Sequence, residues 1–438
     1  MKLSKYEKFF LFEIAAILIV NVNFFGLPIV SDAFIWLADY HRKKLVCGLV
    51  TFLFVQYFVF ERKLKLVINA GSYFKLVYFY LFMIFVISGM SCVIYSQKLD
   101  DLFNTYYYLI SILLFFVLDY HFKKSDNFYQ HFLNLIIDIG VLYAVYVIIA
   151  KVLYRFGFTI FSTQIYYVQT RGNSLRLASP ADYLGIAAVL CFAILIRSHF
   201  AFSTQKQRLS YMKFIVIVFA VIFVTQTRIY EVAIISSCLL MYLFSAKLTI
   251  KKVVIVLLLS IFVLFFWDIL EHFFASFSVT SENNEYLWST LLRLEGIDYY
   301  LSHMFDHKIM GLGFIVNRSY SWMLYGDNGN IVVSDVGYFG FLGVYGILGL
   351  LFLVFWYYNN IKTSIIIARK HLSFQYIEHI GLFIFIAVSF LSVIFSDSQR
   401  TLYLPIYLAI FDYIYNKSNR VVLKKNIGGC YYEKGGNY

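Results

Sequence analysis

The sequence predicts an all-α polytopic membrane protein, and two observations support this prediction. Of the 438 residues, 61% are hydrophobic and only 14% are charged, whereas soluble globular proteins carry about 25% charged residues. Apolar runs of roughly 17 to 25 residues also recur along the chain, and each has about the length that crosses a bilayer core as a helix. A β-barrel would instead show shorter segments of alternating hydrophobicity. We therefore expect one integral membrane domain over residues 1–438.

Twelve membrane-spanning helices are predicted from these apolar runs, with ends defined to roughly two to four residues. They lie at 9–30, 44–60, 74–95, 102–118, 132–154, 180–197, 212–226, 229–246, 253–270, 336–357, 376–395 and 402–416. The first run follows Lys2, Lys5 and Lys8 in the manner of a signal peptide, but no small-x-small cleavage site follows it. We interpret it as an uncleaved first helix.

The basic residues predict the orientation of these helices. The formal net charge of +12 is typical of a polytopic protein whose lysines and arginines lie mainly in cytoplasmic loops, so it does not indicate a nucleic-acid partner. With the N-terminus inside, 24 of the 37 lysines and arginines fall in inside segments. Both termini are therefore predicted to be cytoplasmic.

The only long polar interruption of the apolar pattern is residues 270–335, which this topology places outside the cytoplasm as one large loop. Within it, residues 286–305 carry apolar side chains at helical spacing, and Arg293, Tyr300 and His303 lie around the more polar flank. The pattern predicts a short helix on or in the outer membrane surface. It fits equally well a helix that only packs against the bundle.

Most basic residues of the outside segments from Arg155 onward are arginines. Arginine binds phosphate in a bidentate geometry, whereas lysine is sufficient to set topology, so these arginines are candidates for contact with a phosphate-bearing ligand. Arg171 and Arg176 lie in a turn-rich segment that ends at Pro180. Arg155 and Arg400 are interpreted instead as interfacial anchors.

Arg228 lies between two apolar segments that have almost no loop between them. An arginine at or below the membrane edge is costly unless it pairs with an anion. Glu231, three residues later, is one such anion, and the pair would hold a tight hairpin. A bound ligand is the other, and the two interpretations are compatible.

Asp335 ends the polar stretch just before the tenth predicted helix. Ser334 or Asp335 is placed to cap that helix, and a carboxylate at the outer mouth of a bundle is also placed to accept a proton from a sugar hydroxyl. His303 and His307 are the other titratable groups considered for base work, although isolated loop histidines are more often solvated than catalytic.

Glycines recur at every third position of the tenth helix, from residue 337 to residue 349. Each costs about 1 kcal/mol of helix propensity relative to alanine. The run predicts close contact between backbones or, alternatively, a broken helix that lines a cavity.

Several reaction classes are not indicated by any motif in the chain. The sequence contains no P-loop, no dinucleotide-binding fingerprint, no H-E-x-x-H motif and no nucleophile elbow. Its five cysteines show neither a disulfide framework nor zinc-ligand spacing. We expect neither an ATP-driven enzyme nor a metalloprotease, and we predict no metal or cofactor.

Four segments, taken in order, resemble the family of O-antigen polymerases and O-antigen ligases. Arg171 to Pro180 is similar to its arginine-glycine-proline segment, with Arg176 as an extra arginine. Thr225 to Tyr230 is similar to its serine-arginine turn, with threonine in place of serine. Arg293 to Phe314 and Ser334 to Phe352 resemble its loop segment ending in glycine-x-glycine and the glycine-rich helix that follows.

The resemblance implies a GT-C-like glycosyltransferase of the bacterial inner membrane with about twelve helices and one large periplasmic loop, 270–335, that contains short helices. Its substrates would be oligosaccharide repeat units linked to undecaprenyl diphosphate, and its product O-antigen or a related surface polysaccharide of lipopolysaccharide biosynthesis. Its other partners would be inner-membrane lipid and a chain-length regulator protein. No metal is required by this chemistry.

The same resemblance implies roles for particular residues. Arg228 and Arg293 would clamp the diphosphate, and Arg171 and Arg176 would grip a donor or acceptor phosphate. Asp335, or failing that His303, would orient or deprotonate the acceptor hydroxyl. Tyr300 and Trp288 are expected to stack on sugar faces.

Two other functions share much of this pattern. The ligases carry a histidine near the place of Asp335, and this departure favours a polymerase over a ligase. A flippase for the same lipid-linked glycan would have a basic cavity inside the bundle, short loops and internal repeats. The chain shows no clear repeat between its halves.

Overall fold

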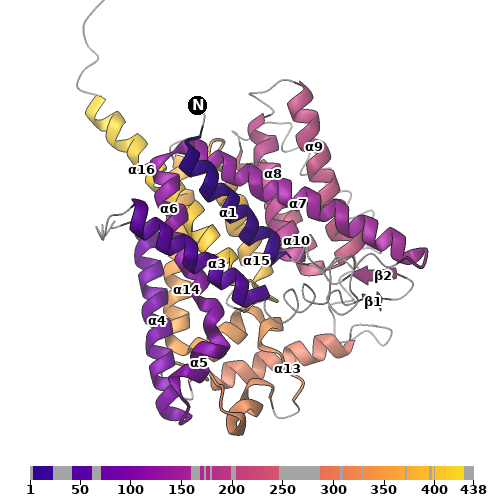
Figure 1. Cartoon of the computed structure of the whole chain (residues 1–438), viewed down its shortest axis with the longest axis vertical. Coiled ribbons are helices and arrows are strands. Elements are labelled where there is room, and N and C mark those ends of the chain that lie inside the picture. Colours follow the sequence, from indigo (N-terminus) through magenta and orange to yellow (C-terminus); the bar gives the residue numbers. More distant parts are fainter. Residues whose placement is uncertain are drawn as a thin grey trace, which may run out of the picture.

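The structure is a computed structural model of the chain, and its architecture is a bundle of helices (Figure 1). It describes residues 3–22, 42–61, 71–158, 168–171, 174–177, 180–198, 204–245, 287–305, 309–326, 329–369, 372–393, 397–398 and 400–428. Eleven of the twelve predicted segments overlap a described helix. The ninth, 253–270, lies outside the described residues, as do 270–286 of the polar stretch.

The N-terminal half is helical except for one short hairpin. Its elements are α1 (Lys5–Asn21), α3 (Arg42–Gln56) with the π turn η2 (Tyr57–Glu61), α4 (Ser72–Ile94), α5 (Leu99–Tyr106), η3 (Tyr107–Leu113), α6 (Leu114–Lys124), α7 (Asp126–Arg155), β1 (Val168–Arg171), β2 (Ser174–Leu177) and α8 (Ala181–Ser198). The strands β1 and β2 pair in antiparallel register, with Arg171 opposite Ser174. This hairpin forms the only sheet in the described part of the chain.

The C-terminal half adds helices and three short helical turns. Its elements are α9 (Thr204–Phe219), the π turn η4 (Ala220–Thr225), α10 (Arg228–Phe244), α13 (Leu287–His303), η5 (Arg318–Leu324), η6 (Val333–Asp335), α14 (Gly337–Arg369), α15 (Ile377–Ser389) and α16 (Tyr403–Gly428). The helix predicted over 286–305 is α13. It lies across the bundle rather than along it (Figure 1).

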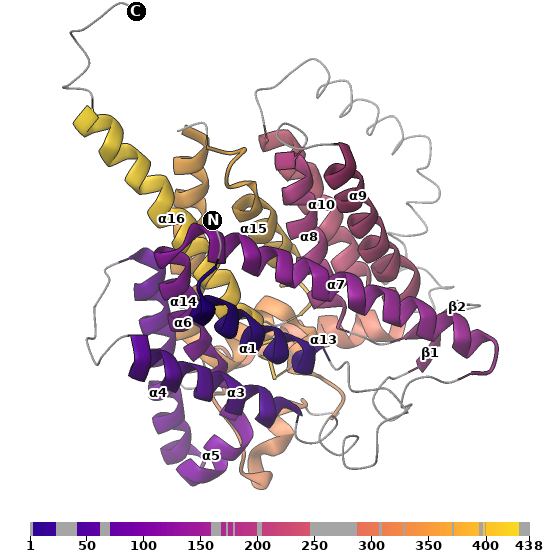
Figure 2. The same ribbon diagram turned by 45° about the horizontal axis from the view of Figure 1, so that its top comes forward.

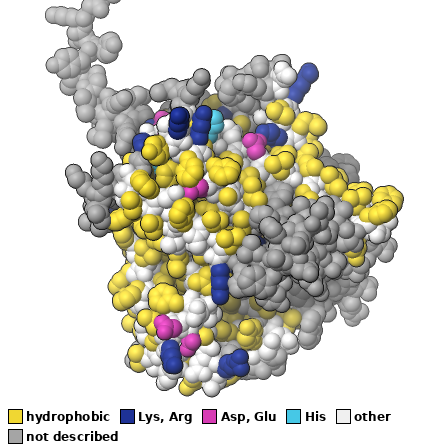
Figure 3. All heavy atoms as spheres, in the orientation of Figure 1, with side chains coloured by type: hydrophobic (Ala, Val, Ile, Leu, Met, Phe, Trp, Pro, Cys, Tyr) yellow, Lys and Arg dark blue, Asp and Glu magenta, His cyan; other side chains and the backbone are white. Residues whose placement is uncertain are grey.

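Six described helical segments are long and apolar enough to cross a membrane. They are Arg42–Phe60, Ser72–Ile94, Leu99–Lys124, Asp126–Arg155, Gln207–Thr225 and Gly337–Arg369. Hydrophobic side chains cover much of the surface between the two ends of the bundle (Figure 3), as expected where lipid replaces water. The structure is therefore consistent with an all-α membrane protein, while the total of twelve spans stays a prediction.

The two ends of the bundle carry different elements. The start of α1 and the end of α16 lie toward one end (Figures 1 and 2). The helix α13 lies toward the other end, and the hairpin lies beside the ends of α8 and α10 that face α13 (Figure 1). We call this the α13 end. The two described chain ends therefore share one side of the bundle, and the cytoplasmic location of that side stays a prediction.

The glycine-rich helix α14 is interrupted at Gly346, whose φ of 57° and ψ of −141° are not helical. The loop at 309–313 fills the interruption. The Leu312 amide donates to the Gly343 carbonyl at 2.8 Å, and the Gly313 amide donates to Val344 at 2.9 Å. A Cβ on Gly311 would lie 2.2 Å from the Gly343 oxygen. The prediction of close contact between backbones is therefore confirmed, and the helix is also broken there, with the loop rather than a cavity at the break.

Helix α4 holds the other side of this loop. The Tyr95 hydroxyl donates to the Leu312 carbonyl at 2.6 Å, and the Ser91 hydroxyl accepts from the Phe314 amide at 2.9 Å. Gln97 donates to the Phe314 carbonyl as well. Irregular backbone is tolerated within a bundle only where its polar groups have partners. These bonds supply them, so the segment that follows α13 is fixed to the bundle.

Buried ion pairs tie helices together at the end opposite α13. Lys123 lies 2.8 Å from Asp119 and 2.6 Å from Asp412, and both carboxylates are buried. Arg197 lies 3.2 Å from Glu378, which also accepts a hydrogen bond from the Tyr129 hydroxyl at 2.9 Å. Buried charges are stable only when paired in this way. This network holds α6, α7, α8, α15 and α16 in place, away from the predicted site.

Candidate functional site

The turn that carries Arg228 has a strained backbone. The π turn η4 ends at Thr225, and Gln226 follows with φ 48° and ψ 42°, in the left-handed region. This conformation costs a residue other than glycine roughly 1–2 kcal/mol. Such strain persists only where surrounding contacts impose it, and both π turns and strained residues concentrate at functional sites. We call residues 225–228 the Arg228 turn.

Arg176 holds the Arg228 turn from the side of the hairpin. Its Nε donates to the Thr225 carbonyl at 2.8 Å, and its second terminal nitrogen donates to the Thr227 hydroxyl at 3.2 Å. The two segments singled out from the sequence, 171–180 and 225–230, therefore meet. Arg171 lies in β1, and its side chain is outside the described part of the chain.

Arg228 is the first residue of α10 and is half-buried. The backbone N–H groups of a helix N-terminus carry partial positive charge, so an arginine is unfavourable at this position unless a negative group is nearby. Glu231, in the same first turn of α10, is one such group. An anion bound there would contact both the guanidinium and the amide dipoles. The location suits the diphosphate contact that the resemblance implies.

Arg293 and Asp335 lie on adjoining segments. A Cβ on Gly296, one turn after Arg293 on α13, would lie 2.9 Å from Val336 and 3.1 Å from Ile331, so this face of α13 crosses the chain next to Asp335. Both Arg293 and Asp335 are exposed. The Asp335 carboxylate accepts a hydrogen bond from the Ser334 hydroxyl at 3.3 Å.

Neither Ser334 nor Asp335 occupies the capping position of the next helix. They belong to the 3-10 turn η6, and α14 begins at Gly337, directly after Val336. The capping interpretation of Asp335 is therefore wrong. Its carboxylate faces solvent at the α13 end instead.

Tyr300 does not offer its ring to a ligand. Its side chain is 0% exposed, its hydroxyl donates to the Leu324 carbonyl at 2.7 Å, and a Cβ on Gly343 would lie 2.6 Å from its Cβ. The prediction that Tyr300 stacks on a sugar is wrong for this conformation. The periodicity of 286–305 placed Tyr300 on the polar flank of the helix, but α14 packs against α13 at Tyr300 and covers it. Trp288 has no described side chain.

His303 is less suited than Asp335 to act as the general base. Its Nδ1 lies 2.8 Å from the Tyr299 carbonyl, which makes Nδ1 the donor in the neutral ring, and its ring packs on Tyr299 at 4.2 Å between centroids. It also lies ten residues after Arg293 in the same helix, roughly 15 Å along the axis. Of the two candidates for the general base, Asp335 is the one whose segment packs against α13 within a turn of Arg293. His307 lies outside the described residues.

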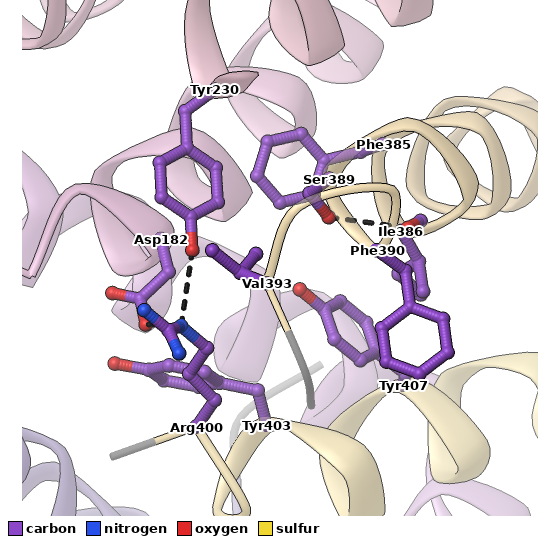
Figure 4. A pocket seen from close by; sticks show the side chains of 10 residues that line it. All are labelled: Asp182, Tyr230, Phe385, Ile386, Ser389, Phe390, Val393, Arg400, Tyr403 and Tyr407. Atoms are coloured by element: carbon purple, nitrogen blue, oxygen red, sulfur yellow. Dashed lines mark hydrogen bonds and ion pairs between the residues drawn. The ribbon is translucent and has the colours of Figure 1, made fainter. Parts of the chain in front are cut away.

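Arg400 lies in a cluster that the sequence did not indicate (Figure 4). Its Nε lies 3.2 Å from the Tyr230 hydroxyl and 3.6 Å from the Asp182 carboxylate, and its Nη1 pairs with Asp397. The side chain is 18% exposed. The interpretation of Arg400 as an interfacial anchor is therefore wrong, whereas Arg155 is exposed at the end of α7. More than 200 residues separate Asp182 from Arg400, so no local pattern could join them.

A small cavity lies beside this cluster. Its volume is about 30 Å³, and its lining includes Asp182, Tyr230, Phe385, Phe390, Arg400, Tyr403 and Tyr407. A cavity of this size has room for one or two water molecules and not for a sugar ring. The two carboxylates also neutralise Arg400, so the cluster is built to hold elements together rather than to bind a phosphate.

Phe390, directly after α15, lies near the segments that follow Arg228 and Asp335. The Phe390 carbonyl accepts a hydrogen bond from the Tyr338 amide at 3.0 Å, and a Cβ on Gly337 would lie 2.1 Å from the same oxygen. Phe390 also lines the cavity with Tyr230. The residues that follow Arg228 and those that follow Asp335 therefore both lie close to Phe390.

In the described part of the chain, no three His, Cys, Asp or Glu side chains are grouped so that they could hold a metal ion. The chemistry at the α13 end is that of guanidinium groups at a helix start and a helix face, with exposed carboxylates at Glu295 and Asp298 on α13 and at Asp335. A scan against protein-family models gave no match, and a search of curated proteins gave no significant match either.

Proposed function

We propose that this chain is an inner-membrane glycosyltransferase of the O-antigen polymerase type. It would polymerise undecaprenyl-diphosphate-linked oligosaccharide repeat units at the periplasmic face. One observation carries the proposal: at the α13 end of the bundle, Arg176 binds the Arg228 turn, and the segment bearing Arg293 packs against the segment bearing Asp335. A lipid-linked diphosphate donor needs cations and a carboxylate in such a place, at the edge of an apolar bundle.

In the proposed reaction, a hydroxyl of the acceptor sugar attacks the anomeric carbon of the donor chain. The bond from that carbon to the phosphate oxygen breaks, a glycosidic bond forms, and undecaprenyl diphosphate leaves. Arg228 and Arg293 stabilise the charge that develops on the leaving diphosphate, and pre-placed cations contribute several kcal/mol to such a step. Asp335 accepts the hydroxyl proton. Binding both lipid-linked substrates side by side supplies proximity.

The glycan profile of a strain that lacks the protein tests the proposed function. Loss of a polymerase leaves a single repeat unit on the lipopolysaccharide core. Loss of a ligase leaves uncapped core together with lipid-linked polymer. Loss of a flippase leaves lipid-linked units on the cytoplasmic face. Only the first result supports the proposal, and either of the others overturns it.

Replacing Arg293 by lysine tests the diphosphate contact. Lysine keeps the charge but loses the bidentate fork, and a hydrogen bond between charged groups is worth about 1.5–3 kcal/mol. We expect polymer synthesis to fall roughly 10- to 100-fold at equal protein level. Arg155→Lys is the matched control, because Arg155 is also an exposed arginine in a helix. Equal polymer length in both variants would exclude bidentate binding by Arg293.

Replacing Asp335 by asparagine tests the base. Asparagine has nearly the same shape but does not accept a proton, and general base catalysis contributes about 100- to 10,000-fold. The exposed position of Asp335 makes a loss of folding unexpected. Full activity of Asp335→Asn would remove this residue as the base.

A further inference from the structure

We propose that Arg400 is a positioning residue, which together with Asp182 fixes the first turn of α10 and thereby the direction of Arg228. The inference deepens the proposed function and rests on it for the identity of the ligand. No sequence motif indicates it, since it depends on side chains from three distant segments that meet at the cluster in Figure 4.

Arg400 reaches the Arg228 turn through Tyr230. The Tyr230 hydroxyl lies 3.2 Å from the Arg400 Nε, and Tyr230 is two residues after Arg228 in the same helical turn. The Tyr230 ring is 4% exposed and stacks on Phe385, with centroids 5.9 Å apart and planes at 20°. A ring held on its face and at its hydroxyl cannot rotate without moving the start of α10.

Arg400 is itself held from two sides. The Asp397 carboxylate accepts from the Arg400 amide at 2.8 Å and pairs with its guanidinium, while Asp182, at the start of α8, lies 3.6 Å from its Nε. In the same loop, Ser398 accepts a hydrogen bond from Lys43 of α3. The guanidinium is therefore fixed relative to α3 and α8, and it transmits that fixed position to Tyr230.

Arg176 and Arg400 bind residues on either side of Arg228 in the sequence. Arg176 binds Thr225 and Thr227, before Arg228, and Arg400 binds Tyr230, after it. Both attach to the start of α8, because β2 leads into that helix and Asp182 belongs to it. This double attachment explains how the left-handed Gln226 is kept in place.

The charges around Arg400 indicate that its role differs from that of Arg228. Two carboxylates surround Arg400, so the cluster of Asp182, Asp397 and Arg400 carries a formal charge of −1. A diphosphate gains little from a guanidinium that is already neutralised in this way. Arg228 is the group that meets the ligand, and Arg400 acts through it.

Amide hydrogen exchange tests, without any ligand, whether Arg400 fixes the first turn of α10. We compare the peptide that covers residues 221–231 in wild type, Arg400→Lys, Tyr230→Phe and the exposed control Arg155→Lys, each in a lipid nanodisc. Lysine has no Nε–H, and phenylalanine keeps the ring stacking but loses the hydroxyl. We expect about tenfold faster exchange at Gln226 to Tyr230 in both cluster variants and wild-type exchange in the control. Unchanged exchange in both cluster variants would overturn the proposal.

A double-mutant cycle tests whether Arg400 acts through Arg228. Affinity for undecaprenyl diphosphate is measured for wild type, Arg400→Lys, Arg228→Ala and the double variant. We expect Arg400→Lys to weaken binding about tenfold in the wild-type background and not at all when Arg228 is alanine. Equal losses in both backgrounds would show that Arg400 acts independently and would overturn the inference. If the wild-type protein has no affinity for this lipid, the proposed function is refuted. The exchange experiment would still show whether Arg400 fixes the first turn of α10.

Discussion

Gly311→Ala should strongly destabilise the protein, because Gly311 lies where the loop after α13 enters the break in α14. Its φ of 58° is left-handed, which costs alanine about 1–2 kcal/mol. The new Cβ would lie 2.2 Å from the Gly343 oxygen, so the loop must move and the bonds from Leu312 to Gly343 and from Gly313 to Val344 are lost or weakened. Each is worth about 1 kcal/mol. Together these terms give a loss of about 3–4 kcal/mol.

The matched control is Gly329→Ala. Gly329 has a φ of 70°, but a Cβ there meets nothing within 4 Å. It carries only the conformational term, about 1–2 kcal/mol. Thermal unfolding of the two variants in the same detergent isolates the contribution of the loop contact, which we expect to be about 2 kcal/mol. If Gly311→Ala is no less stable than Gly329→Ala, the loop is not held in the α14 break.

Three further predictions concern the site and its supports. Gly185→Ala places a Cβ 2.4 Å from the Phe385 ring, which stacks on Tyr230. We expect the free energy of unfolding to fall by about 1–3 kcal/mol and polymer synthesis to be reduced. The control Gly89→Ala, which has open space around its Cβ, should be neutral or slightly stabilising in the same thermal assay. Gln97→Ala removes one donor to Phe314 and the acceptor of the Val316 and Asn317 amides, so the free energy of unfolding should fall by about 2–3 kcal/mol. Gln97→Glu keeps that acceptor and should lose about half as much stability. Equal losses in the two variants would argue against the amide contacts. Arg228→Lys should shorten the polymer at equal protein level, because the fork is lost; unchanged length would exclude bidentate diphosphate binding by Arg228.

The positions of the helices were largely predictable from composition and periodicity. A run of apolar residues that must satisfy its own backbone in lipid has few alternatives to a helix, so 74–95 and 132–154 anticipate α4 and α7 within a few residues at most ends. The same pattern located α13. It could not show that α14 covers Tyr300, because a periodic face does not reveal what packs against it.

The supports of the candidate site could not be predicted in the same way. Arg176 was recognisable as a basic residue in a turn, but its contact with Thr225 depends on how the hairpin folds back on η4. Arg400 was misjudged, because an arginine before a span is usually an anchor, and its partner Asp182 is distant in sequence. Nothing local to 397–403 distinguishes a buried arginine from an exposed one.

The sequence by itself determined the all-α, apolar character of the chain, the helical segments and the residue types available at the α13 end, since all three follow from local hydrophobicity and spacing. Only the tertiary structure decided which of those residues meet. The loop that fills the break in α14 and the binding of the Arg228 turn by Arg176 both depend on contacts between segments far apart in the chain. Such contacts arise from packing and from pairing of buried polar groups, which a one-dimensional pattern does not encode.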